Sequence, residues 1–291
     1  MPRKTSTIYR SVWISDLHLG TRRCRAAELL TFLKTTTAET LYLVGDIFDV
    51  QSRGFGQWVW MPLHTAVVHA ILDAAANGTR VVYIPGNHDP QGHALVAAGI
   101  KTLDIDHPAM ADLAALLPKE LLDRVGDWQR IHVESTTVHT TATGKKLLLI
   151  HGDQLDTFHE DCGWTLGYIG ELAYGWLAYR SQVSTKRRKK KTGNDRLPKL
   201  ERELADIWHN ALRGFRTKAV KMAVKAKCDG VVCGHLHLPD VRILKNKKKG
   251  YLYINDGDWT ISATALTEDA DGHLTLVYYD HAPMKQAPEF P

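Results

Sequence analysis

Residues 41–50, LYLVGDIFDV, change from an apolar run into acidic residues within a few positions. Short runs of aliphatic and aromatic residues are typical of buried β-strands. Gly45 and Asp46 follow this run directly, and Asp49 comes three residues later. In layered α/β folds, ligands collect beyond the carboxyl ends of strands. The stretch therefore predicts a buried strand that presents Asp46 at a binding edge.

The same pattern occurs four more times along the chain. Apolar runs end before Asp16-Leu17-His18, before Asn87-His88-Asp89, before His151-Gly152-Asp153 and before His235-Leu236-His237. Taken singly, each junction is ordinary turn chemistry. Together they predict a site assembled at one edge of a β-scaffold, with these metal-ligand candidates: Asp16, His18, Asp46, Asn87, His151, His235 and His237.

The donor set narrows the kind of metal site. It mixes carboxylate, amide oxygen and imidazole without thiolate, which argues against a structural zinc site. Such donors suit Mn, Fe, Zn or Ni. Seven donors are too many for one ion but suit two ions that share a carboxylate. Two-metal sites promote in-line displacement at phosphorus, so the pattern predicts hydrolysis of a phosphoester or phosphoanhydride.

These five motifs resemble those of the calcineurin-like metallophosphoesterases, in the same order, over residues 12–237. The resemblance implies an α/β (α+β) fold, a four-layer sandwich of two packed mixed β-sheets flanked by helices. It implies one ion held by Asp16, His18, Asp46 and His237, and a second held by Asp46, Asn87, His151 and His235. His88 would be catalytic, contacting the scissile phosphate or the leaving group, and Asp89 would orient it.

A long insertion separates the fourth and fifth motifs. Aromatic residues recur at helical spacing before its centre, from Trp164 to Tyr179, and leucines do so after it, from Leu197. We expect residues 155–225 to form a helical hairpin lid with a basic loop, and residues 1–154 and 226–291 to form the metallophosphoesterase core. The aromatic stripe is explained either by packing against the core or by an apolar groove for acyl chains. Phe55, Trp58 and Trp60 would form the opposite wall of such a groove.

The centre of the insertion is strongly basic. Residues 186–191 read KRRKKK, although the whole chain has a formal net charge of only +5. A solvated linker is one reading of such a run. The other is a surface for an anionic partner such as a membrane leaflet, a phosphorylated substrate or nucleic acid. The predicted substrate contacts are Trp164, Tyr168, Trp176, Arg187 and Arg188.

The lid and the motifs together resemble one branch of the superfamily, the UDP-2,3-diacylglucosamine diphosphatases of lipid A synthesis. That resemblance includes Gly257-Asp258-Trp259. It implies cleavage of a pyrophosphate in a nucleotide-linked lipid, giving UMP and an acylated sugar 1-phosphate, with two divalent ions, typically Mn²⁺. The best-known members have Arg where this chain has His88. The alternatives are a phosphodiesterase or nuclease acting on nucleotides or nucleic acid, and a protein phosphatase.

Composition limits where such an enzyme would act. The 291 residues contain no run of about 18 apolar residues, and the N-terminus lacks the apolar segment of a secretory signal. The four cysteines show no zinc or redox spacing. These features predict a reducing, cytoplasmic location. Lys186–Lys191 would then supply peripheral contact with the anionic surface of the inner membrane.

Overall fold

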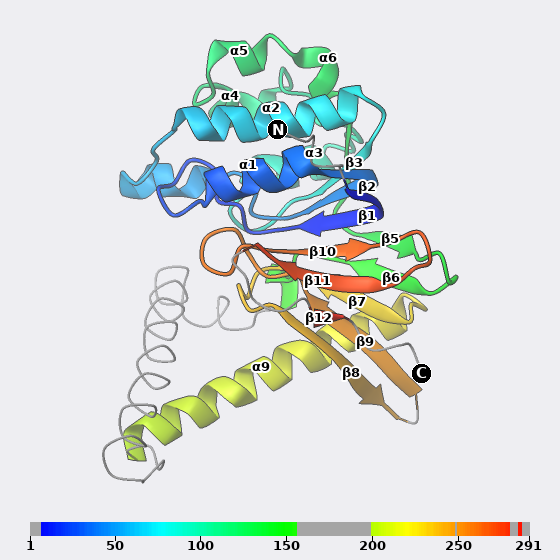
Figure 1. The fold of residues 1–291 in the computed structure, drawn as a ribbon. Helices are drawn as coiled ribbons and strands as arrows, with labels where there is room; N and C mark the ends of the chain where they lie inside the picture. Colours follow the sequence, from blue (N-terminus) through cyan, green and yellow to red (C-terminus); the bar gives the residue numbers. More distant parts are fainter. Residues whose placement is uncertain (1–6, 156–198, 248, 280–284, 287–291) are drawn as a thin grey trace, which may run out of the picture. The chain divides into compact units, whose positions relative to one another are not determined.

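The computed structural model describes residues 7–155, 199–247, 249–279 and 285–286. Two mixed β-sheets form its centre (Figure 1). The seven-stranded sheet has the order β12-β11-β10-β1-β2-β3-β4, and the five-stranded sheet has the order β5-β6-β7-β9-β8. The strands are β1 Thr7–Ile14, β2 Thr36–Val44, β3 Arg80–Ile84, β4 Ile131–Val133, β5 Thr137–Thr140, β6 Lys146–Leu149, β7 Gly230–Cys233, β8 Asp240–Asn246, β9 Lys249–Asn255, β10 Thr264–Glu268, β11 Leu274–Tyr278 and β12 Lys285–Gln286.

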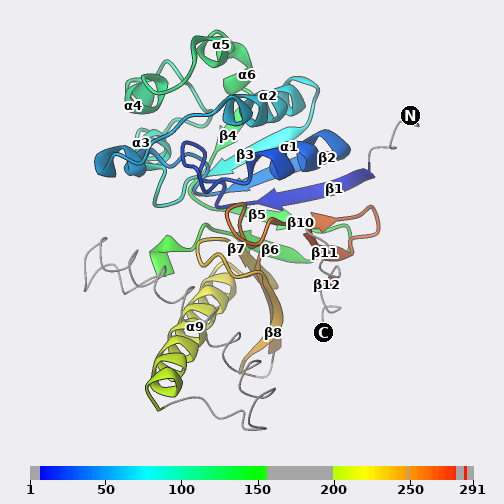
Figure 2. The ribbon, with the colours of Figure 1, turned by 60° about the vertical axis from the view of Figure 1, so that its left-hand side comes forward.

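Helices cover the outer face of the seven-stranded sheet, as both ribbon views show (Figures 1 and 2). They are α1 Ala26–Thr35, α2 Pro62–Ala76, α3 Pro90–Ala97, α4 Ala111–Ala114, α5 Lys119–Leu122 and α6 Val125–Trp128, with 3₁₀ turns η1 Val50–Phe55 and η2 Pro108–Met110. Further along the chain lie η3 Asp153–Leu155 and α9 Lys199–Lys225. Among the described helices, none combines the length and apolar character needed to cross a bilayer.

Side-chain alternation along the first strands builds two cores. On β1, Val12 and Ile14 belong to the core beneath the helices, whereas Trp13 belongs to the core between the sheets. Successive side chains of a strand point to opposite faces, so a strand that is apolar at every position is buried on both sides. This explains why the motif runs are continuously apolar. The predicted fold class, two packed mixed sheets flanked by helices, is confirmed.

Strand direction brings the motifs together. β1, β2 and β3 are parallel neighbours, and β6, β7 and β9 are parallel neighbours in the other sheet. Parallel strands end on the same edge, so the segments that follow these six strands gather there. The expected motifs follow five of them. The sixth segment, which follows β9, begins at Asp256.

The chain divides into two compact units. One comprises Met1–Asp153 with Val220–Pro291, and the other comprises Gln154–Ala219. Most of the second unit lies outside the described residues, so the predicted lid of residues 155–225 remains a prediction. Its described part includes most of α9.

Candidate metal centre and active site

The backbone turns sharply where the strands end. Left-handed φ angles, which side chains other than glycine rarely adopt, occur at five of the predicted ligands. Backbone hydrogen bonds hold two of these turns together: the Asp16 N–H donates to Gly45 O at 2.9 Å, and the His18 N–H donates to Asp46 O at 2.9 Å. The φ values are 52° at Asp16, 49° at His18, 53° at Asp46, 68° at His235 and 52° at His237.

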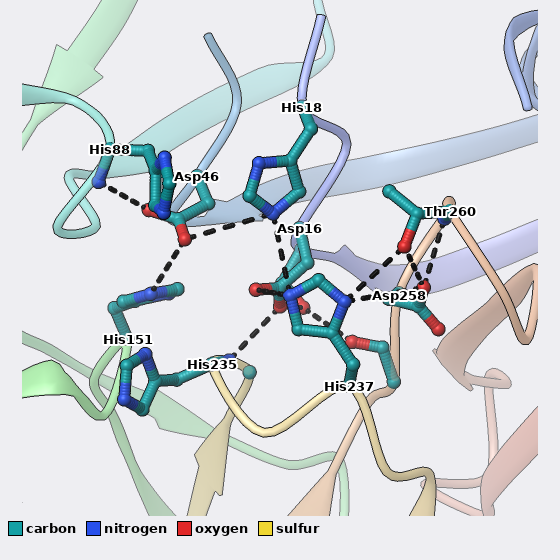
Figure 3. A network of polar contacts seen from close by, with 12 residues as sticks. Asp16, His18, Asp46, His88, His151, His235, His237, Asp258 and Thr260 are labelled. Carbon is teal, nitrogen blue, oxygen red and sulfur yellow. Dashed lines mark hydrogen bonds and ion pairs between the residues drawn. The ribbon is translucent and has the colours of Figure 1, made fainter. Parts of the chain in front are cut away.

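Asp16, His18 and His237 form a first group of donor atoms (Figure 3). His237 Nε2 lies 3.2 Å from Asp16 Oδ1 and 3.3 Å from His18 Nε2. The other Asp16 oxygen is already satisfied, because Oδ2 accepts from the Ser15 hydroxyl at 2.5 Å and from the His235 N–H at 3.0 Å. The two oxygens of Asp16 thus differ, because Oδ2 is held by two donors whereas Oδ1 faces the ring of His237.

Asp46 connects this group to a second one. Its Oδ2 lies 3.8 Å from His18 Nε2 and 3.4 Å from His151 Nε2, while its Oδ1 accepts from the His88 N–H at 2.8 Å. The second group contains Asp46, Asn87, His151 and His235. In it, Asn87 Oδ1 lies 3.2 Å from His151 Nε2 and 3.1 Å from His235 Nδ1. A single oxygen of Asp46 thus faces ligands of both groups, as a bridging carboxylate requires.

In three of the histidines, the ring nitrogen Nδ1, which points away from the other donor atoms, faces an oxygen that can accept a hydrogen bond. His18 Nδ1 lies 3.0 Å from Asp49 Oδ2, and His151 Nδ1 lies 2.8 Å from Val44 O. His237 Nδ1 faces Asp258 Oδ2 at 3.4 Å. Protons on these nitrogens would leave the Nε2 lone pairs of His18 and His237 facing each other at 3.3 Å. Facing lone pairs beside the Asp16 carboxylate repel one another unless a proton or a cation lies among them, so the residues fit a metal site.

Gly86 allows the second group to be compact. A Cβ at this position would overlap Asp46 Oδ1 and approach His151 Nε2 to 2.8 Å. The glycine of the Gly-Asn-His-Asp motif is therefore required for close approach of the backbone to the donors.

Asp49, and not Asp89, positions His88. Asp49 Oδ1 lies 2.8 Å from His88 Nδ1, while its Oδ2 contacts His18. Asp89 accepts backbone N–H groups instead, from Phe48 at 2.8 Å and from Ile47 and Gly86 at 3.1 Å. The prediction that Asp89 orients His88 was wrong, because Asp89 is buried beneath the loop and joins two backbone segments.

The charges of the site are strongly coupled. Burial disfavours the ionised form of Asp46, but the nearby His151 and His88 outweigh it and hold its pKa well below its usual value. Burial likewise disfavours the imidazolium of His88, but the charge of Asp46 and the hydrogen bond that His88 donates to Asp49 raise its pKa to about 9. Burial and the charge of Asp46 raise the pKa of Asp89 to about 7. The site therefore stabilises positive charge among its carboxylates.

The predicted substrate contacts Trp164, Tyr168, Trp176, Arg187 and Arg188 lie outside the described residues, as do Lys186–Lys191. Trp58 and Trp60 are described, and both are partly buried. Their rings stack with centroids 5.6 Å apart. A Cβ on Gly20 would overlap the Trp58 ring, so this ring packs against the backbone two residues after His18. Trp58 therefore lies against the loop that carries His18.

The segment after β9 supplies residues that the predicted site did not include. Ser15 Oγ lies 2.8 Å from Asp256 Oδ1, and Asp258 faces His237. The sequence carries a signal for them, because residues 251–254, YLYI, are followed by Asn255-Asp256-Gly257-Asp258. This is the same change from an apolar run to acidic residues that marks the other five junctions.

Comparison with known proteins gives consistent matches. UDP-2,3-diacylglucosamine hydrolase of Pseudomonas fluorescens is 25% identical over 279 residues, covering 94% of this chain and 96% of that protein. The Pseudomonas paraeruginosa protein of the same name is 26% identical over 277 residues, covering 90% and 96%. Among solved structures, Vps29 of Entamoeba histolytica aligns with a TM-score of 0.43 at 10% identity, covering 95% and 96%.

The family comparison covers most of the chain. Residues 9–239 match the calcineurin-like phosphoesterases, and this range includes all five of the predicted motifs. The chain therefore belongs to the calcineurin-like phosphoesterase family and is a metal-dependent phosphoesterase.

Proposed function

We propose that this enzyme hydrolyses the pyrophosphate of UDP-2,3-diacylglucosamine, or of a similar nucleotide-linked lipid, to UMP and an acylated sugar 1-phosphate. The observation that carries this proposal is the similarity to UDP-2,3-diacylglucosamine hydrolases over nearly the whole length of both chains. Because the alignments extend across residues between the fourth and fifth motifs, they support a shared substrate class as well as shared chemistry.

Two divalent cations, which we expect to be Mn²⁺, would occupy the two groups of donors. The first would be held by Asp16, His18, Asp46 and His237, and the second by Asp46, Asn87, His151 and His235. Bound cations of this kind lower the pKa of water and neutralise charge on phosphoryl oxygens. The proximity of Asp46 Oδ2 to both His18 and His151 supports a shared ligand.

His88 would act at the leaving oxygen. Its Nδ1 is held by Asp49, so its Nε2 is the nitrogen available to the substrate. A protonated ring there can donate to the leaving group or stabilise charge on the phosphoryl oxygens. The leaving group of a pyrophosphate is itself a phosphate and needs little acid assistance. Asp89 would act indirectly, by fixing the loop that carries His88.

His88 also favours a second candidate function. The best-known diphosphatases of the resembled branch have Arg at this position. A histidine paired with a buried carboxylate suits leaving groups that require a proton, such as the alkoxide of a nucleoside. A phosphodiesterase acting on nucleotides is therefore the alternative that the His88–Asp49 pair supports.

The test compares substrates on manganese-loaded protein, with metal-free protein and Asp46→Asn as controls. The panel is UDP-2,3-diacylglucosamine, UDP-glucose, a diadenosine polyphosphate, a phosphopeptide and single-stranded DNA. We expect release of UMP from the acylated substrate, with kcat/KM at least about 100-fold above that for UDP-glucose, since burying even a few methylene groups supplies this discrimination. Equal rates on UDP-glucose would reject acyl recognition. Preference for the diadenosine substrate would establish the alternative.

A further inference from the structure

Asp258 is a buried carboxylate held in one orientation by its own turn. It is fully buried and accepts backbone N–H groups from Thr260 at 2.9 Å, Ile261 at 2.6 Å and Ser262 at 2.9 Å. The hydroxyls of Thr260 and Ser262 also donate to it. So many donors leave the carboxylate little freedom to rotate, and Oδ2 is directed at His237.

His237 lies between this turn and Asp16, another member of the first group of donors (Figure 3). Its Nδ1 is 3.4 Å from Asp258 Oδ2 and 3.3 Å from Thr260 Oγ1. Its Nε2 is 3.2 Å from Asp16 Oδ1. The contacts of Nδ1 with the turn therefore fix the orientation of the ring, and with it the position of Nε2, the atom that would bind a cation.

The contacts behind His18, His151 and His237 differ in charge. Carboxylates stand behind His18 and His237, namely Asp49 and Asp258. A backbone carbonyl, Val44 O, stands behind His151. A carboxylate on the outward nitrogen fixes the tautomer and makes the imidazole a stronger donor than a neutral carbonyl does.

We propose that Asp258, together with Thr260, is a positioning pair that orients His237 and selectively strengthens the first of the two cation positions. This rests on the proposed dinuclear function and adds a difference between its two positions. Asp258 does not touch substrate; it acts only through the ring of His237. Removing its charge weakens one cation and leaves the other unchanged.

A turn-capping role alone makes a different prediction, and the turn contains the variants that separate the two. Thr260→Val and Ser262→Ala each remove one hydroxyl that donates to Asp258. Only the Thr260 hydroxyl also contacts His237. A purely structural role requires the two variants to behave alike, whereas positioning requires Thr260→Val to weaken cation binding more than Ser262→Ala does.

The experiment titrates metal-free full-length protein with Mn²⁺ in a calorimeter, without substrate. Asp258→Asn should weaken one binding step by about 10- to 100-fold, as loss of an outer hydrogen-bond partner typically does. In an Asn87→Ala background, where the first position remains, the same loss should appear. In a His237→Ala background Asp258→Asn should change nothing, because the ring that it orients is gone.

The proposal would be overturned by equal losses in the Asn87→Ala and His237→Ala backgrounds, or by no loss in either. Equal effects of Thr260→Val and Ser262→Ala would also overturn it, and this pair remains informative if Asp258→Asn fails to fold. The ring N–H resonance of His237 in zinc-loaded protein should shift in Asp258→Asn and shift less in Ser262→Ala. A wild-type protein that binds no Mn²⁺ would instead refute the proposed function.

Discussion

Replacing Asp49 with asparagine should impair turnover far more than the same change at Asp89. Asp49 serves two rings, with Oδ1 2.8 Å from His88 Nδ1 and Oδ2 3.0 Å from His18 Nδ1. An amide has only one oxygen, so in Asp49→Asn an NH₂ group opposes the N–H of one ring. At least one charge-assisted hydrogen bond is then lost.

The loss of at least one hydrogen bond sets the expected size of the effect of Asp49→Asn. A hydrogen bond to a charged group contributes about 1.5–3 kcal/mol. At about 1.4 kcal/mol per factor of ten, this corresponds to a loss of about 10- to 150-fold in kcat, in Mn²⁺ affinity, or divided between them. In Asp89→Asn the NH₂ group would oppose backbone N–H groups of Phe48, or of Ile47 and Gly86, instead of a catalytic ring, so its main effect should be on stability.

The assay measures kcat and KM for hydrolysis of UDP-2,3-diacylglucosamine at saturating Mn²⁺, with urea unfolding of both variants. A double variant with His88→Ala provides the control, because Asp49→Asn should lower kcat much less once the ring that it positions is absent. Refutation would be an Asp49→Asn enzyme within about threefold of wild type both in kcat and in the Mn²⁺ concentration that half-activates it, or an Asp89→Asn enzyme that loses more kcat while remaining equally stable.

Three further outcomes are expected. His88→Ala should reduce turnover of an alkyl phosphodiester by about 100-fold or more but spare a nitrophenyl ester, whose leaving group needs no proton; equal losses would contradict proton donation. Asp46→Ala should lose both cations on dialysis, and metal analysis that still finds two would exclude a bridging role. Burial lowers the pKa of His64 to about 4 from 6.5. Its contribution to stability is therefore complete above pH 6.5 and lost as the pH falls toward 4, by up to about 3 kcal/mol. Urea unfolding of metal-free protein should show this slope, and His64→Gln should lack it; identical slopes would assign the pH dependence to other groups.

The sequence was sufficient for the junctions that follow β1, β2, β3, β6 and β7. Continuous apolar runs mark strands buried on both faces, and parallel pairing then brings their ends to one edge. The ligand candidates lie directly at these junctions, and the structure brings donor atoms of Asp16, His18, Asp46, His151 and His237 together.

Sequence spacing could not show which carboxylate meets His88. Asp89 is adjacent in the chain, but its side chain turns toward backbone N–H groups. Asp49 comes from the neighbouring strand's loop and reaches the ring only through the pairing of β2 with β3. Asp258 entered the sequence analysis only within the Gly257-Asp258-Trp259 resemblance and without a role, because that role depends on the ring of His237, which only the folded chain places beside it.

The left-handed backbone at five of the donor positions has a consequence for how such a centre can be lost. Left-handed conformations cost about 1–2 kcal/mol at each residue that carries a side chain, and glycine avoids that cost. In a descendant released from catalysis, glycine at His235 would remove this cost, whereas at Asp16 and Asp46 the loss of buried hydrogen bonds would offset the gain. Among divergent copies of this enzyme, glycine at position 235 would therefore mark chains that no longer need this ring for catalysis.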